Sequence, residues 1–115
     1  MTASAARTAA AGAVASLVWA AVEPPVRRAF GTEYSDVRFV GLTLHVANGA
    51  VFALAYRELR RRRRVPALAA ALVEHVALWP VVALVDRDGR DPRAFVSSGI
   101  GHAVFGVVLG RLLED

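Results

Sequence analysis

The stretch VPALAAALVEHVALWPVVALV, residues 65–85, decides how this chain folds. It is bounded by Arg64 and Asp86, and its charged or ionisable interruptions are Glu74 and His75. A helix rises about 1.5 Å per residue, so about 17 to 25 residues cross the ~30 Å hydrocarbon core of a bilayer. The segment therefore predicts a membrane-spanning helix.

Three further apolar segments flank this one. With their bordering residues they cover residues 8–24, 38–57 and 94–112. Hydrophobic residues make up 56% of the 115-residue chain, and the charged residues gather between the segments, whereas in a soluble bundle they recur along each helix face. We therefore expect a single all-α transmembrane domain over residues 1–115, an integral membrane four-helix bundle of up-down topology.

The first apolar segment has a second interpretation. Arg7 precedes it, and small alanine residues follow within it, which is also the pattern of a secretory signal peptide. The sequence leaves open whether residues 1–22 are cleaved.

Arginine sets the expected orientation. All fourteen basic residues are arginine, and six of them lie in residues 57–64. The positive-inside rule places this connection, and with it both termini, in the cytoplasm. The absence of aromatic residues from the run argues against nucleic-acid binding. An arginine-only basic set is typical of a high-GC genome and indicates a bacterial cytoplasmic (inner) membrane. The side chains expected to contact anionic lipid headgroups are Arg60, Arg61, Arg62, Arg63 and Arg64.

Prolines mark the expected helix boundaries. Pro24 and Pro25 predict that the first helix ends before them, because a proline lacks the backbone donor of a helix interior. Asp91 followed by Pro92 predicts an N-cap and a first helical position. Pro80 lies inside an apolar segment and predicts a kink there.

Small and polar residues recur at helical spacing on every segment, which predicts the faces that turn inward. A charged side chain at the bilayer centre costs about 2.5 to 3.5 kcal/mol, so such residues usually pair or serve a function. Counting from the segment ends places several ionisable or amide side chains in the centre and outer half of the domain. The candidate ligand or proton site consists of His45, Glu74, His75, His102, Asn48 and Glu23.

Three interpretations of this site remain open. Glu74 could hydrogen-bond His45 or His102 and serve only as a packing lock. A metal ion or a haem could bind at His45, His75 and His102, although no HxxxH or ExxH pair lies on one segment. Alternatively, Glu74 and the histidines could carry a proton or line a solute pathway. No nucleophile motif indicates a particular enzyme, and the cofactor stays unidentified.

Four short motifs resemble those of a known family. They are Trp19 with EPP at residues 23–25, HVANG at residues 45–49, EH and WP at residues 74–80, and GHAVFG at residues 101–106. In these the chain resembles the YagU-like inner-membrane proteins, a bacterial family without an assigned reaction. The resemblance implies a multi-span inner-membrane protein and draws attention to His45, His75 and His102.

The size of the chain bears on its partners. Four short helices enclose little volume, which favours a homo-oligomer or a membrane partner subunit. In a second class of function the protein is an accessory or assembly subunit whose Gly106 and Gly110 face docks that partner, since glycines four residues apart allow close helix contact.

Overall fold

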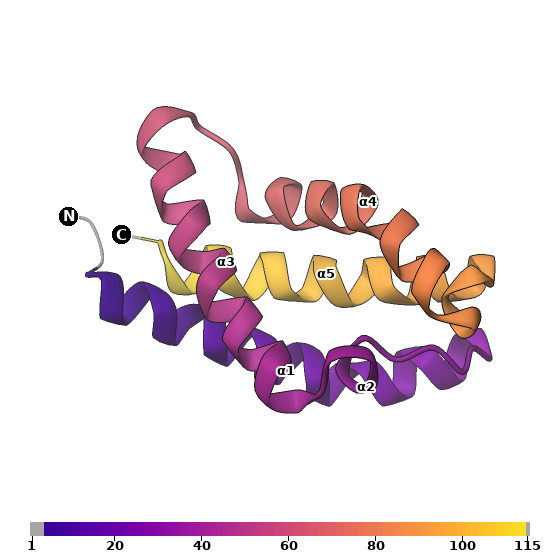
Figure 1. The fold of residues 1–115 in the computed structure, drawn as a ribbon. Coiled ribbons are helices and arrows are strands. Elements are labelled where there is room, and N and C mark those ends of the chain that lie inside the picture. Colours follow the sequence, from indigo (N-terminus) through magenta and orange to yellow (C-terminus); the bar gives the residue numbers. More distant parts are fainter. Residues whose placement is uncertain (1–3, 115) are drawn as a thin grey trace.

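The computed structural model describes residues 4–114, and within them the chain is all helical and contains no strand. Its elements are α1 (Ala5–Phe30), α2 (Asp36–Val40), α3 (Leu42–Arg62), α4 (Ala67–Val85), the 3-10 helix η1 (Arg87–Arg90) and α5 (Pro92–Leu112). Successive long helices run in opposite directions, so α1 begins and α5 ends at the same end of the molecule (Figure 1).

The long helices are joined as a series of packed pairs. α1 packs against both α3 and α5, and α5 also packs along α4, whereas α3 and α4 touch at most marginally. In Figure 1, α3 crosses α1 obliquely while α4 follows α5. The expected up-down four-helix bundle is therefore shown only as an all-helical assembly of packed pairs. Residues of both α3 and α4 line the cavity described below.

The distribution of side chains is that of a protein in lipid. The buried positions of α4 are Ala67, Ala71 and His75, while Leu84 on the same helix is 76% exposed. Among the described residues, α1, α4 and α5 are each long and apolar enough to cross a membrane. The Cα trace extends 43 Å along its longest axis, close to the ~40 to 45 Å of a bilayer with its headgroups. These features identify a membrane protein with transmembrane helices.

The second expected span, residues 38–57, is divided in the structure. Gly41 has a φ of 84°, a value that favours glycine, and it separates the short α2 from α3. α3 then continues to Arg62, through much of the arginine run. Compared with the expected segment, α3 lacks Phe39 at its start and includes further arginines at its end, so it is less apolar. It is not among the helices that meet the length and hydropathy of a span.

The expectation that α1 ends before Pro24 is wrong. The helix continues through Pro24 and Pro25 to Phe30 and ends at Gly31, which has a φ of 66°. The N–H of Gly31 bonds back to the carbonyl of Arg28 at 3.2 Å, a left-handed glycine cap. Each proline removes one donor but holds φ near the helical value, so the pair is tolerated and the glycine sets the helix end.

Two other proline assignments hold. Asp91 caps α5 by accepting the Arg93 N–H at 2.9 Å, and Pro92 is the first residue of the helix. α4 remains helical through Pro80. Figure 1 shows the axis of α4 changing direction along its length, as expected for a helix that contains an interior proline.

The Gly106 and Gly110 face is used inside the chain. A Cβ added at Gly106 would lie 2.7 Å from the Cα of Leu68, so the absence of a side chain lets α5 approach the α4 backbone. A Cβ at Gly110 would meet the Cβ of Ala67 at 3.6 Å. Within this structure the glycine pair docks α4, and it is not a free surface for a partner subunit.

Candidate intramembrane polar site

A cavity of about 430 Å³ opens among α1, α3, α4 and α5, with α2 at one end. Aromatic side chains form much of its wall: Trp19, Tyr34, Phe39, Phe52, Trp79 and Phe105. Five of the six candidate site residues from the sequence also line it: His45, Asn48, Glu74, His75 and His102. Among the residues that the structure describes, no arginine lines this cavity.

Trp19 lies at the centre of the buried aromatic groups. Its ring centroid is 4.6 Å from that of His45 in an edge-on arrangement and 4.4 Å from that of His102. Gly101 of α5 lies against the indole, where a Cβ would collide with the ring. Trp19 therefore lies between His45 on α3 and His102 on α5.

Each histidine donates one ring N–H to a backbone carbonyl. The Nε2 of His45 donates to the carbonyl of Ser16 at 3.0 Å, and the Nε2 of His75 donates to that of Phe95 at 2.9 Å. The Nδ1 of His102 donates to the carbonyl of Ser98, one turn back on its own helix, at 2.8 Å. Since a carbonyl can only accept, these contacts assign the hydrogen to the named nitrogen, and the other nitrogen of each neutral ring is an acceptor.

Of the two partners that the sequence offered for Glu74, His102 is the one that lies close, at ion-pair distance and beyond the length of a hydrogen bond. The Oε1 of Glu74 lies 3.7 Å from the Nε2 of His102. The Glu74 side chain is 37% exposed, toward the cavity, while the imidazole is buried. Because the Nδ1 of His102 already holds a hydrogen, the nitrogen that faces Glu74 is the one that can accept a proton. His45, the other expected partner, lies against Trp19 instead.

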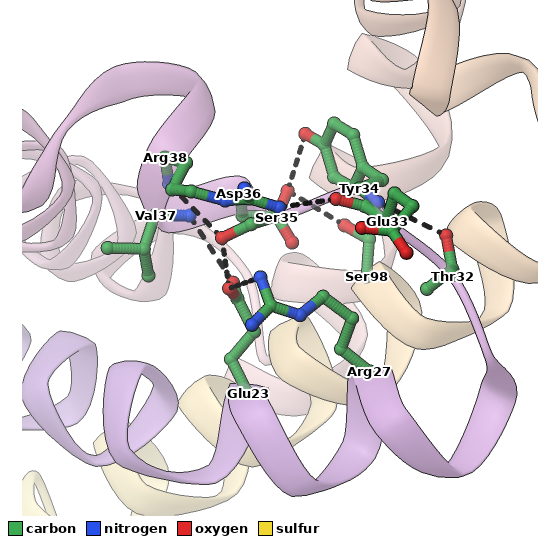
Figure 2. A network of polar contacts seen from close by, with 10 residues as sticks. All are labelled: Glu23, Arg27, Thr32, Glu33, Tyr34, Ser35, Asp36, Val37, Arg38 and Ser98. Atoms are coloured by element: carbon green, nitrogen blue, oxygen red, sulfur yellow. Dashed lines mark hydrogen bonds and ion pairs between the residues drawn. The ribbon is translucent and has the colours of Figure 1, made fainter.

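A second polar group adjoins this pair at the α2 end. Asp36 accepts through its Oδ1 from the Tyr34 hydroxyl and from the Ser98 hydroxyl, both at 2.9 Å (Figure 2). The Ser98 Oγ also lies 3.5 Å from the Nδ1 of His75 and from that of His102. Burial raises the pKa of Asp36 to about 6, although the two hydrogen bonds oppose the shift. Burial and the neighbouring Asp36 also raise the pKa of Tyr34.

Sequence reasoning did not find Asp36 or Tyr34. Both lie in what reads as an outer loop, and their partner Ser98 is far away along the chain. A signal was present in Ser35, whose hydroxyl caps α2 by accepting the Arg38 N–H at 3.1 Å. A serine followed by an acidic residue is a common helix start and would have placed Asp36 in the first turn of a helix.

Glu23 belongs to a separate network. Its carboxylate is buried and accepts from the Ser35 hydroxyl and from the Val37 N–H, the latter at 3.3 Å (Figure 2). Arg27, one turn along α1, lies 3.9 Å away. Glu23 is not among the cavity-lining residues, so it ties the start of α2 to α1 rather than joining the histidines.

The structure does not group the histidines as a metal centre. Within residues 4–114, no three His, Cys, Asp or Glu side chains are arranged to hold a metal ion. Trp19 stands between His45 and His102, which separates two of the three expected ligands. The arrangement gives no support to a metal or haem site at these residues.

The arginine run lies at the end of the molecule where α1 begins and α5 ends (Figure 1). The Nη1 of Arg60 donates to the carbonyl of Leu113 at 3.3 Å. Glu58 lies 3.5 Å from Arg61 and 3.8 Å from Arg62, and all three side chains are largely exposed. The guanidinium groups of Arg61 and Arg62 are therefore exposed at this end of the molecule.

Comparisons of the chain with protein-family models, with curated proteins and with solved structures gave no match in any of the three. The chemistry of the site is therefore the basis for its interpretation. That chemistry consists of a carboxyl and an imidazole sharing a polar contact inside an aromatic cavity, next to a half-buried aspartate.

Proposed function

We propose that this is a small proton-binding membrane protein, in which Glu74 and His102 share one exchangeable proton inside the helix assembly. The observation that carries the proposal is the 3.7 Å approach between the Glu74 Oε1 and the His102 Nε2. The proton resides on the carboxyl or on the imidazole, and because 3.7 Å exceeds a direct hydrogen bond, its transfer requires a small approach of the two side chains or a bridging water. A shared proton also removes the cost of leaving a lone charge in the membrane.

Ser98 and Asp36 supply a route for that proton to one end of the molecule. An imidazole can accept a proton at one nitrogen and release one from the other. The Nδ1 of His102 lies 3.5 Å from the Ser98 Oγ, which in turn donates to Asp36. With a pKa of about 6, Asp36 exchanges protons readily near neutral pH. The route ends at the loop that carries Tyr34.

The proposal includes the membrane arrangement expected from the sequence. α3 is the remaining crossing, since it runs in the direction opposite to α1, packs against it, and contains 21 residues. The arginine end, with both termini, faces the cytoplasm of a bacterial inner membrane and contacts anionic headgroups. The broad apolar surface of α4 favours a homo-oligomer or a membrane partner. The resemblance to YagU-like proteins fits this assignment.

Isotope-edited spectroscopy tests the shared proton. In detergent-solubilised protein, the carboxylic-acid infrared band of Glu74 and the ¹⁵N shift of the His102 Nε2 should change together over the same pH interval. Glu74→Gln should remove the band and displace the His102 transition, while Glu58→Gln, at the exposed arginine end, should leave both unchanged. Independent transitions of the two groups in the unaltered protein would overturn the proposal.

A second candidate is that the histidines are packing locks. His45 and His75 each donate to a carbonyl of a neighbouring helix, His45 to α1 and His75 to α5. This role and proton binding are separable, because Glu74 is outside both of these bonds. If the bonds of His45 and His75 are the whole role of the polar core, Glu74→Gln will leave stability unchanged and His102 will show no transition coupled to Glu74.

A further inference from the structure

We infer that the cavity binds a lipophilic organic cation, which displaces the proton shared by Glu74 and His102. The inference rests on the proposed proton site and names the class of ligand that the same cavity takes. Three observations carry it. The wall is aromatic, the lining contains carboxyl groups but no arginine among the described residues, and α3 and α4 do not pack closely on each other.

The lining offers negative charge and aromatic faces but no fixed positive charge. The chain has fourteen arginines, yet among the described residues none lines the cavity, while Glu74 and Asp36 both do. Six aromatic side chains line the wall, and aromatic rings attract a cation through the ring quadrupole. An anion would meet two carboxyl groups and, among the described residues, no arginine, so the lining selects against it.

Hydrogen-bonding capacity points the same way. The ring nitrogens that keep hydrogens are occupied by backbone carbonyls, which leaves acceptors such as the Nδ1 of His45 and the Nε2 of His102. Asn48 supplies an amide at the cavity wall. Beside the indole N–H of Trp19, which has no partner in the described part of the chain, these acceptors suit a ligand that brings positive charge or N–H groups.

Size and access define the ligand further. A volume of about 430 Å³ falls within the ~300 to 1,000 Å³ of small-molecule sites, and it matches a compact multi-ring cation. α3 and α4 do not pack on each other, and apolar Val51 and Leu78 line the cavity from these two helices. A cation that dissolves in the bilayer can therefore reach the site between them.

Charge balance couples the cation to the proton. The Glu74 and His102 pair is neutral when it holds one proton. When a monovalent cation pairs with the Glu74 carboxylate, that proton leaves and the net charge of the site is unchanged. Five other titratable groups line the cavity with Glu74, and none of them is on α1. They are Tyr34 in the loop, Asp36 on α2, His45 on α3, His75 on α4 and His102 on α5. By linkage, acidification must weaken cation binding as much as the cation weakens proton binding.

An isosteric pair of ions provides the test. Tetraphenylphosphonium and tetraphenylborate have nearly the same shape and opposite charge, and the chain has two tryptophans, Trp19 and Trp79, both at the cavity wall. In purified, detergent-solubilised protein, tetraphenylphosphonium should change the tryptophan fluorescence saturably and release about one proton per bound cation, read with a pH dye in weak buffer. Tetraphenylborate should do neither.

Glu74→Gln should weaken tetraphenylphosphonium binding by about tenfold or more and abolish proton release, and Glu58→Gln should match the unaltered protein. Lowering the pH of the unaltered protein should weaken binding without any substitution, which keeps the test independent of how well a variant folds. Failure of tetraphenylphosphonium to bind saturably, or equal binding of the borate, overturns the cation site. Because the shared proton is measured separately by spectroscopy, that result leaves the proposed function standing.

Discussion

Gly12 of α1 and Gly49 of α3 face each other where the two helices cross, so closely that a Cβ added at Gly12 would collide with the carbonyl oxygen of Gly49. A Cβ at Gly49 would in turn lie 2.7 Å from the Gly12 carbonyl oxygen and would also meet Ser16. This contact of two backbones holds α3 against the assembly, and it sets the distance across which His45 bonds to α1.

Substituting the crossing glycines should destabilise the protein. Gly49→Ala must push α3 away from α1, and Gly106→Ala must push α5 away from α4; overpacking of this kind costs about 1 to 3 kcal/mol. Gly110→Ala is the matched control, since its Cβ would make an ordinary contact at 3.6 Å. Unfolding in mixed micelles, followed by circular dichroism, measures the difference. A control as damaging as the other two would contradict the packing described.

The hydrogen bond from His75 to the Phe95 carbonyl should contribute to the α4 and α5 interface. His75→Leu removes the donor from a buried contact, and a loss of about 0.5 to 1.7 kcal/mol is expected. His75→Gln keeps an N–H at similar reach and should recover most of the stability. The same unfolding assay reads both variants. Equal stability of the Leu and Gln variants would show that shape, rather than the bond, holds this contact.

Asp36 should make stability depend on pH. Burial raises its pKa from 3.8 to about 6, so folding favours the neutral acid. That contribution is complete below pH 3.8 and is lost as the pH rises through 6, because the folded state then has to carry the charge. Between about pH 4 and pH 7.5 the unaltered protein should lose of order 1 to 3 kcal/mol relative to Asp36→Asn.

The same pH series on Asp88→Asn, an exposed position of η1, provides the control. It should follow the unaltered protein at every pH. An Asp36→Asn variant with an unchanged pH profile would remove Asp36 from the proton route as well as from the stability argument.

Single cysteines should report the side of the membrane on which each connection lies. The chain has no cysteine, so exposed sites can be labelled one at a time against a clean background. Glu33→Cys and Asp88→Cys should react with an impermeant maleimide in intact cells, and Arg62→Cys only after permeabilisation. Labelling of Glu33→Cys and Arg62→Cys from the same side would show that α3 does not cross.

The apolar segments of the sequence predicted the C-terminal helices well. The segment at residues 65–85 became α4 (Ala67–Val85), and Asp91 and Pro92 correctly marked the start of α5. Apolar pattern did not reveal the break at Gly41 because the residues on both sides are hydrophobic, and only the backbone angle of the glycine separates them. The end of α1 was predicted wrongly because the free-energy cost of a proline inside a helix is offset by the packing of the rest of α1.

For the site, helical spacing predicted which faces turn inward but not which helices meet. His45, His75 and His102 are all buried, as expected, and Glu74 meets one of its two predicted partners. The order in which helices pack is set by close contacts such as that of Gly12 with Gly49, and helical spacing places each glycine on an inward face without showing which partner it meets. For the same reason the contact between Ser98 and Asp36, between two distant segments, could not be inferred.

The pairwise packing of the long helices has a consequence for biosynthesis. α1 and α3 form one hairpin and α4 and α5 another, and the principal interface between the two is that of α1 with α5. The first hairpin can assemble while the second is still being translated, whereas α4 waits for its partner until the last helix has emerged. Fragments divided in the exposed connection at residues 63–66 should therefore recombine when co-expressed, each half entering the bilayer as a finished hairpin.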